Sequence, residues 1–157
     1  MSNFCRTKIL ASIKSLNEIG LVLKKGVDII DFKDPSVGSL GALSIKQISF
    51  FLKSIPSNQL TSATIGDIKD IKIIKQKVIK LSKTSIDFIK IGVFFDEKRI
   101  KLLKNLKKLV KNKKIIAVLF ADNKPNVNLI REIKKIQFDG ILIDTKNKKN
   151  SNMQKKP

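Results

Sequence analysis

Short apolar segments alternate with amphipathic segments along most of this chain. The apolar segments have the length and composition of buried strands, and the segments between them place apolar side chains at the spacing of one helix face. Such an alternation is typical of βαβ units around a parallel sheet, so we predict an α/β fold. The expected strands are 7–12, 27–32, 59–65, 86–91, 114–121 and 139–144, and the expected helices are 13–25, 44–54, 68–83, 97–111 and 128–136.

The alternation stops after the sixth expected strand, and this bounds the architecture. Six strands fit either an open doubly wound sheet or the first three-quarters of an eight-stranded TIM barrel, whose usual length is about 250 residues. With 157 residues and 42% hydrophobic composition, the chain is long enough for one domain, which we place at residues 1–145. Residues 146–157 contain several lysines, no acids and almost no apolar side chains, so we predict a disordered tail there.

The net charge of +20 suggests a nucleic-acid partner at first, because polyanions attract such a surface. However, only Arg6, Arg99 and Arg131 of the 33 basic residues are arginine, the side chain best suited to phosphate and base recognition. Aromatic and basic residues do not interleave, so solvated helix faces explain the lysines better. The single Cys5 and the lack of an apolar run of about 20 residues predict a cytoplasmic protein with no membrane span.

Residues 27–42 carry the strongest sign of chemistry in the sequence. Residues 27–32 have the composition of a buried parallel strand, and strand side chains alternate between faces, so Asp31 and Lys33 share one face at the strand's carboxyl end. A glycine-rich turn follows, whose backbone can come close to a ligand. A second lysine, Lys90, ends the fourth expected strand. Active sites of α/β proteins lie at this end of the sheet, so we predict one here.

Five strand-end motifs stand in order along the chain. They are residues 28–35 with 38–42, Ser-Ala-Thr-Ile-Gly-Asp at 62–67, Asp-Phe-Ile-Lys-Ile-Gly at 87–92, Phe-Ala-Asp at 120–122 and Asp-Gly-Ile-Leu-Ile-Asp-Thr at 139–145. Together they resemble the (5-formylfuran-3-yl)methyl phosphate synthase family of methanofuran biosynthesis, over about residues 7–148. The resemblance implies a TIM-barrel lyase, a carbon–oxygen lyase acting on phosphates. It condenses two molecules of glyceraldehyde 3-phosphate, with loss of phosphate and water, and uses no metal or organic cofactor.

The resemblance also implies roles for particular residues. Lys33 matches the family's Schiff-base lysine, Lys90 matches its proton acceptor, and Asp31 and Asp144 match acidic residues of the pocket. Lys148 falls where the family carries another lysine after the sixth strand, and we assign it to substrate binding. The further candidates for substrate binding are the strand-end residues Ser62, Thr64, Gly66 and Asp67. Glycines after strands also form backbone nests for phosphate.

The residues themselves set conditions on this chemistry. A Schiff base needs an unprotonated amine, whereas free lysine has a pKa of about 10.4. Burial and a second cation nearby favour the neutral amine, while Asp31, two residues from Lys33, stabilises the ammonium, and the sequence leaves open which effect prevails. Once an iminium forms, a base such as Lys90 can remove the proton from the neighbouring carbon. For a single lysine in so basic a chain, a surface position remains the commoner explanation.

The chain departs from the family after the sixth strand. The family continues through two more strands, and the loops after strands seven and eight of TIM barrels commonly hold the substrate phosphate. We expect either an active but impaired lyase or an inactive remnant, and the lysine- and asparagine-rich ending is what a frameshift or a truncated gene would produce. A nucleic-acid-binding polycation is the third hypothesis. An unclosed barrel exposes two strand edges to pairing, so a homo-oligomer is a further expectation.

Overall fold

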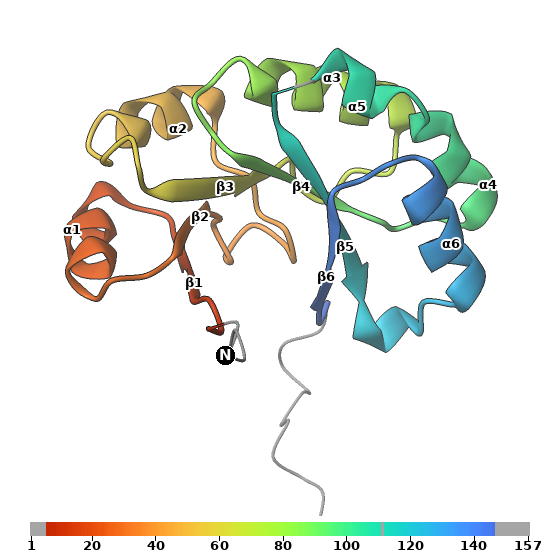
Figure 1. Ribbon diagram of the computed structural model, residues 1–157, viewed down its shortest axis with the longest axis horizontal. Helices are drawn as coiled ribbons and strands as arrows, with labels where there is room; N and C mark the ends of the chain where they lie inside the picture. Colours follow the sequence, from red (N-terminus) through yellow and green to blue (C-terminus); the bar gives the residue numbers. More distant parts are fainter. Residues whose placement is uncertain (1–5, 111, 147–157) are drawn as a thin grey trace, which may run out of the picture.

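The computed structural model describes residues 6–110 and 112–146, and it shows one curled parallel sheet with helices on its outer side (Figure 1). The strands are β1 (Leu10–Ile13), β2 (Ile29–Phe32), β3 (Leu60–Thr64), β4 (Phe88–Gly92), β5 (Lys114–Phe120) and β6 (Gly140–Asp144). They lie side by side in chain order, β1 to β6, and every neighbouring pair is parallel. A doubly wound sheet reverses its strand order, so this order decides in favour of the TIM-barrel type of repeat.

Helices fill the connections between strands. They are α1 (Leu16–Lys24), α2 (Ile45–Leu52), α3 (Ile71–Ser82), α4 (Glu97–Ile100), α5 (Leu106–Leu109) and α6 (Val127–Lys135), with short 3₁₀ turns η1 (Lys101–Leu103) and η2 (Ala121–Asn123). Caps set where several of them start. Ser44 accepts a hydrogen bond from the Gln47 N–H at the start of α2, and Asp70 accepts two from the first turn of α3. The cap at Asp70 explains why α3 begins later than the expected residue 68.

Two expected helices differ further from the structure, and the expected strand 7–12 begins only at Leu10. The expected helix 97–111 is broken into α4, η1 and α5, because Asn105 adopts a left-handed conformation with φ of 75°, which Asn tolerates better than most residues but which ends a helix. The expected helix 13–25 starts only at Leu16. Its first turn is closed by a capping box, in which the Glu18 carboxylate accepts a hydrogen bond from the Ser15 N–H, and Ile13 belongs to β1 instead.

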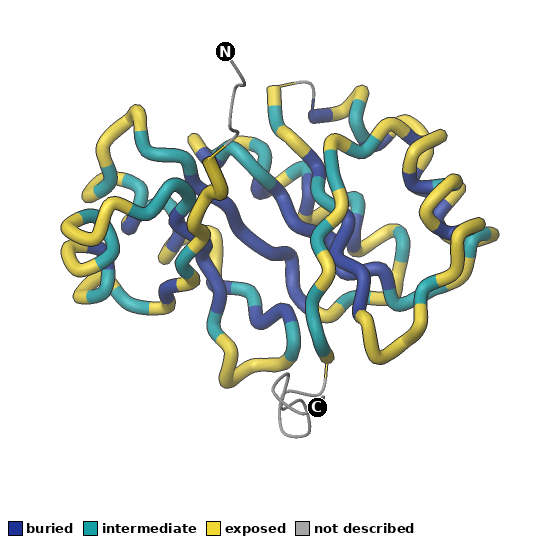
Figure 2. The backbone as a smooth tube through the Cα atoms, turned by 60° about the horizontal axis from the view of Figure 1, so that its bottom comes forward, coloured by how far each residue is buried: buried dark blue, intermediate teal, exposed yellow. Residues whose placement is uncertain are grey.

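The main core lies between the sheet and the outer helices. In β2, Ile30 and Phe32 face this core and are fully buried, while Asp31 and Lys33 face the concave inner side, as the strand alternation predicts. A smaller apolar cluster of Leu40, Val118 and Phe120 lies apart from the main core. Figure 2 shows the buried backbone running through the middle strands.

Among the described residues, no helix is long and apolar enough to cross a membrane. Of the tail predicted at 146–157, only Lys146 lies within the described residues.

Candidate active site

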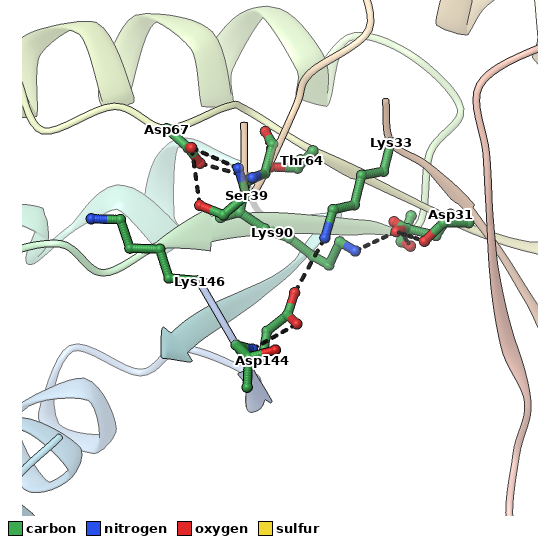
Figure 3. A network of polar contacts seen from close by, with 12 residues as sticks. Asp31, Lys33, Ser39, Thr64, Asp67, Lys90, Asp144 and Lys146 are labelled. Atoms are coloured by element: carbon green, nitrogen blue, oxygen red, sulfur yellow. Dashed lines mark hydrogen bonds and ion pairs between the residues drawn. The ribbon is translucent and has the colours of Figure 1, made fainter. Parts of the chain in front are cut away.

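Two buried lysines lie on the concave side of the sheet, one directly after β2 and one in the middle of β4, whereas the sequence predicts the second at the end of its strand. Lys33 directly follows β2 and is 6% exposed, and Lys90 lies in β4 and is 4% exposed. Figure 3 shows their amino groups pointing toward one another, between Asp31 on one side and Asp144 on the other. The sheet therefore brings together all four residues expected to carry the chemistry.

Lys90 forms the more deeply buried of two ion pairs. Its Nζ lies 2.5 Å from Asp31 Oδ2, and the Asp31 side chain is fully buried. Two hydroxyls complete the surroundings of this carboxylate, because Ser12 donates to Oδ2 at 2.9 Å and Ser62 donates to Oδ1 at 2.6 Å. Parallel register places both serines level with Asp31, one on each neighbouring strand. Asp31 is therefore fixed by hydrogen bonds from three strands.

Lys33 forms the second pair with Asp144, across the concave side of the sheet. Its Nζ donates to Asp144 Oδ2 at 3.2 Å, and the Asp144 side chain is 22% exposed. Asp144 ends β6, so this contact joins the second strand to the sixth. The Asp144 carboxylate also accepts a hydrogen bond from the Thr145 N–H at 2.8 Å. This pair lies closer to solvent than the pair of Lys90 and Asp31.

Burial changes the proton affinity of Lys90. Its pKa is lowered below the ordinary value for lysine, first because burial penalises the charged amine and further because the positive Lys33 lies nearby. The charge and hydrogen bond of Asp31, and the charge of Asp144, oppose the shift without reversing it. For Lys90, burial therefore outweighs the neighbouring carboxylates.

The other predicted residues of 62–67 have partners within the protein. Ser62 donates to Asp31, as described above. Thr64 donates to the Leu40 carbonyl and accepts from the Gly66 N–H, and Gly66 has a positive φ of 94°. Asp67 accepts hydrogen bonds from the loop after Lys33. Their assignment to substrate binding stays a prediction, and Lys148 lies outside the described residues.

Sequence reasoning missed Ser12, and it marked Ser39 and Leu40 only as part of the 38–42 motif, without their contact with Asp67. Ser12 reaches Asp31 only because the register of β1 and β2 places the two residues side by side, and this register is not evident from the sequence. Ser39 and Leu40 bind Asp67 across 28 and 27 residues of sequence, so no local pattern predicts this contact. Within the described residues, no three His, Cys, Asp or Glu side chains gather as a metal site. What the arrangement offers chemically is a pair of amines with carboxylates beside them, suited to nucleophilic and acid–base catalysis.

Comparison with known proteins agrees with this reading of the sequence. The model of the family described as 4-HFC-P synthase matches residues 9–156. The chain belongs to the 4-HFC-P synthase family. Two relatives are named (5-formylfuran-3-yl)methyl phosphate synthase: one from Methanocaldococcus jannaschii, 31% identical over 122 residues, and one from Methanococcus maripaludis strain C7, 32% identical over 126 residues. Each alignment covers 73% of this chain and 52% of the relative, so the chain spans about half the length of these 4-HFC-P synthases.

The chain is also similar in fold to solved structures of other enzymes. A 2,3-dimethylmalate lyase of the PEP mutase/isocitrate lyase superfamily superposes with a TM-score of 0.67 at 12% identity, covering 88% of this chain and 59% of that one. A Ruminococcus gnavus sialic acid aldolase superposes with a TM-score of 0.64 at 14% identity, covering 94% and 56%. At these identities the likeness concerns the fold alone. It supports the TIM-barrel type of repeat that the strand order shows.

Proposed function

We propose that the site performs Schiff-base lyase chemistry on a triose phosphate, in the condensation of two glyceraldehyde 3-phosphate molecules that the family resemblance implies. One observation carries the proposal: two buried lysines on the concave side of the sheet point toward one another, each beside its own carboxylate. Membership of the 4-HFC-P synthase family supports the choice of substrate. Such a pair supplies a nucleophilic amine and a second amine for proton transfer.

In the proposed first step, the Lys33 amine attacks the substrate aldehyde carbon. A C–N bond forms, water leaves and a positively charged iminium results, with Asp144 3.2 Å from the resting amine to balance that charge. Lys33 is the better placed nucleophile because its carboxylate partner is partly exposed, whereas Lys90 is bound to a fully enclosed one. The incoming aldehyde therefore meets Lys33 first.

Lys90 serves as the base in the second step. The iminium draws electrons from the neighbouring carbon, whose proton passes to a neutral Lys90, and the resulting enamine forms a carbon–carbon bond with the second aldehyde. The lowered pKa of Lys90 increases the share of neutral amine that can accept this proton. Loss of one phosphate and, over the whole reaction, of two water molecules, with hydrolysis of the C=N bond, then yields the furan aldehyde and frees Lys33.

Borohydride trapping tests this proposal. The folded protein is incubated with glyceraldehyde 3-phosphate and borohydride, and the adduct is located by intact mass and peptide mapping. We expect a stable adduct on Lys33, because reduction converts the C=N bond to a C–N bond that no longer hydrolyses. Lys33→Arg removes the reactive amine and keeps the charge, so we expect it to lose the adduct.

The matched control is Lys46→Arg, the same substitution at an exposed lysine of α2, which should trap like the wild-type protein. Folding of each variant is checked by circular dichroism. Folded wild-type protein that gives no adduct, or that is modified equally on exposed lysines and on Lys33, contradicts the proposal. An adduct that survives in Lys33→Arg contradicts the choice of Lys33.

A further inference from the structure

The loop at residues 34–42 leads the chain from Lys33 to α2 and folds back on itself. Its ends are joined by a hydrogen bond from the Asp34 N–H to the Gly41 carbonyl at 2.9 Å. A Cβ atom on Gly41 would lie 1.8 Å from the Asp34 carbonyl oxygen, so only glycine fits there. The loop is therefore a compact unit directly attached to Lys33.

Asp67, from the segment between β3 and α3, holds the tip of this loop. Its Oδ2 accepts hydrogen bonds from the Ser39 N–H at 2.9 Å and the Ser39 hydroxyl at 3.0 Å, and its Oδ1 accepts one from the Leu40 N–H at 2.8 Å (Figure 3). Gly38, just before, has a φ of 96°, and a Cβ atom there would lie 2.6 Å from Asp67 Oδ2. Both carboxylate oxygens thus bind the loop, at close approach.

The loop held in this way places Leu40 above Gly92, on the face of β4 that carries Lys90. Leu40 is 1% exposed and packs with Val118 and Phe120 of β5. A Cβ atom on Gly92 would lie 2.6 Å from Leu40 Cδ1, so Leu40 sits directly over Gly92. Gly92 follows Lys90 by two residues and lies on the same face of β4.

Thr64 ties the backbone of the loop to the same place. Its hydroxyl donates to the Leu40 carbonyl at 3.3 Å, and register sets Thr64 level with Lys90 on the neighbouring strand. Leu40 is therefore held from its N–H by Asp67 and from its carbonyl by Thr64.

We propose that Asp67 is a positioning residue that fastens the 34–42 loop as an apolar cap over Lys90. The cap excludes water from the amine, and exclusion of water disfavours the charged form of a buried lysine. Asp67 itself then touches no substrate, in place of the substrate-binding role predicted for it from the sequence. The proposal rests on the proposed function only in taking Lys90 as the working base, and its test needs no sugar phosphate.

The test is trace acetylation with acetic anhydride across a pH series, read residue by residue by peptide mass spectrometry. In the wild-type protein we expect slow acetylation of Lys90, with a midpoint below that of exposed Lys46, since burial lowers the pKa of Lys90. In Asp67→Asn, the side-chain NH₂ group replaces one carboxylate oxygen, so it faces either the Ser39 donors or the Leu40 N–H and cannot accept their hydrogen bonds. Because bonds to a charged acceptor are the stronger kind, we expect about ten-fold faster acetylation of Lys90 and a midpoint moved up toward ordinary lysine.

A shift in the midpoint reports the environment of Lys90 and would not follow from a general loss of stability. The groups that face Lys90 are Asp31, Lys33 and Asp144, and Asp67→Asn alters none of them. Hydrogen exchange should show the same opening, with about ten-fold faster exchange of the Ser39 and Leu40 amides. Ser39→Ala removes only the hydrogen bond of the Ser39 hydroxyl, so Lys90 acetylation and loop hydrogen exchange should change in the same direction but by less. This second variant keeps the proposal testable if Asp67→Asn does not fold.

The matched control is Asp70→Asn, which makes the same change three residues away. Asp70 caps α3 and Asn is an equally good cap, so we expect Lys90 acetylation and loop exchange to stay within about two-fold of the wild-type values. A folded Asp67→Asn protein whose Lys90 midpoint and acetylation rate equal those of the wild-type protein overturns the proposal. An equal shift in Asp70→Asn overturns it too, since the effect would then come from lost charge.

Discussion

The two ion pairs of the site use the same residue types in different surroundings. Lys90 and Asp31 lie 2.5 Å apart with side chains 5% and 0% exposed, and two serines also donate to Asp31. Lys33 and Asp144 lie 3.2 Å apart, and the Asp144 side chain is 22% exposed. The first pair is enclosed by strands β1 to β4, whereas the second closes a gap between β2 and β6.

This difference separates a fixed pair from an exchangeable one. A fully buried carboxylate with three donors is held in one arrangement, and losing any donor leaves part of it unsatisfied. A longer pair with a partly exposed partner exchanges its contact for water or for a substrate group at lower cost. The structure therefore provides a rigid place for proton transfer beside a looser amine at the mouth, which is the division of work that Schiff-base chemistry requires.

The largest effect we expect is on stability, from Asp31→Asn. Breaking a buried pair leaves Lys90 uncompensated, which costs about 3–5 kcal/mol, a large part of the stability of a domain. Asp144→Asn makes the same change in the looser pair and should cost about 1 kcal/mol. Urea unfolding of both variants at pH 7 measures these differences. Equal losses in the two variants would contradict the contrast between the pairs.

The second prediction concerns the pH dependence of stability. The pKa of Lys90 is lowered in the folded protein and ordinary in the unfolded chain, so between the two values the unfolded state binds more protons. The free energy of unfolding therefore rises with pH across that window, which ends near the ordinary lysine pKa of about 10.4. Below the window both states are protonated and Lys90 contributes no slope.

The carboxylate variants sharpen this prediction. Asp31 opposes the lowering of the Lys90 pKa, so Asp31→Asn should lower that pKa further. The rise of the unfolding free energy with pH should then start at a lower pH in this variant. The stability difference between Asp31→Asn and the wild-type protein should therefore become smaller as pH increases. Asp144 opposes it least, and Asp144→Asn should move the onset less. The measurement is the difference in unfolding free energy between each variant and the wild-type protein at several pH values, which cancels the titration of the other lysines. An Asp31→Asn penalty that grows with pH would contradict the sign.

Much of the fold follows from local patterns. Period-two alternation in β2 correctly set Asp31 and Lys33 on the inner face, and Ser44 correctly marked the start of α2. The break at Asn105 escaped because apolar spacing continues through residues 97–111, and a left-handed residue does not disturb that spacing. The pattern of apolar residues predicts which side chains face inward, but it does not predict the backbone conformation of a single residue such as Asn105.

The site shows a similar boundary. The sequence marked Asp31, Lys33 and Lys90 by their strand-end positions and Asp144 by the family resemblance, but it paired Lys33 with Asp31 by proximity. The structure pairs Asp31 with Lys90, 59 residues away, and Lys33 with Asp144, 111 residues away. Register between strands decides such partners, and register comes from the packing of the whole sheet. The same holds for Asp67, whose partners lie on a loop far back in the chain.

The last prediction compares the two serines that donate to Asp31, and one of them gives the smallest effect that we expect. Ser62 is buried and donates at 2.6 Å, so Ser62→Ala leaves one oxygen of a buried carboxylate short of a donor and should cost about 2 kcal/mol. Ser12 is exposed and donates at 2.9 Å, and water can replace its hydroxyl, so Ser12→Ala should cost about 0.5 kcal/mol. Urea unfolding with unchanged m values measures both. If Ser12→Ala costs as much as Ser62→Ala, then solvent does not reach the Asp31 carboxylate from the β1 side. The pair of Lys90 and Asp31 would then be enclosed on its β1 side as well. Its difference in solvent access from the pair of Lys33 and Asp144 would be larger than the exposed fractions indicate.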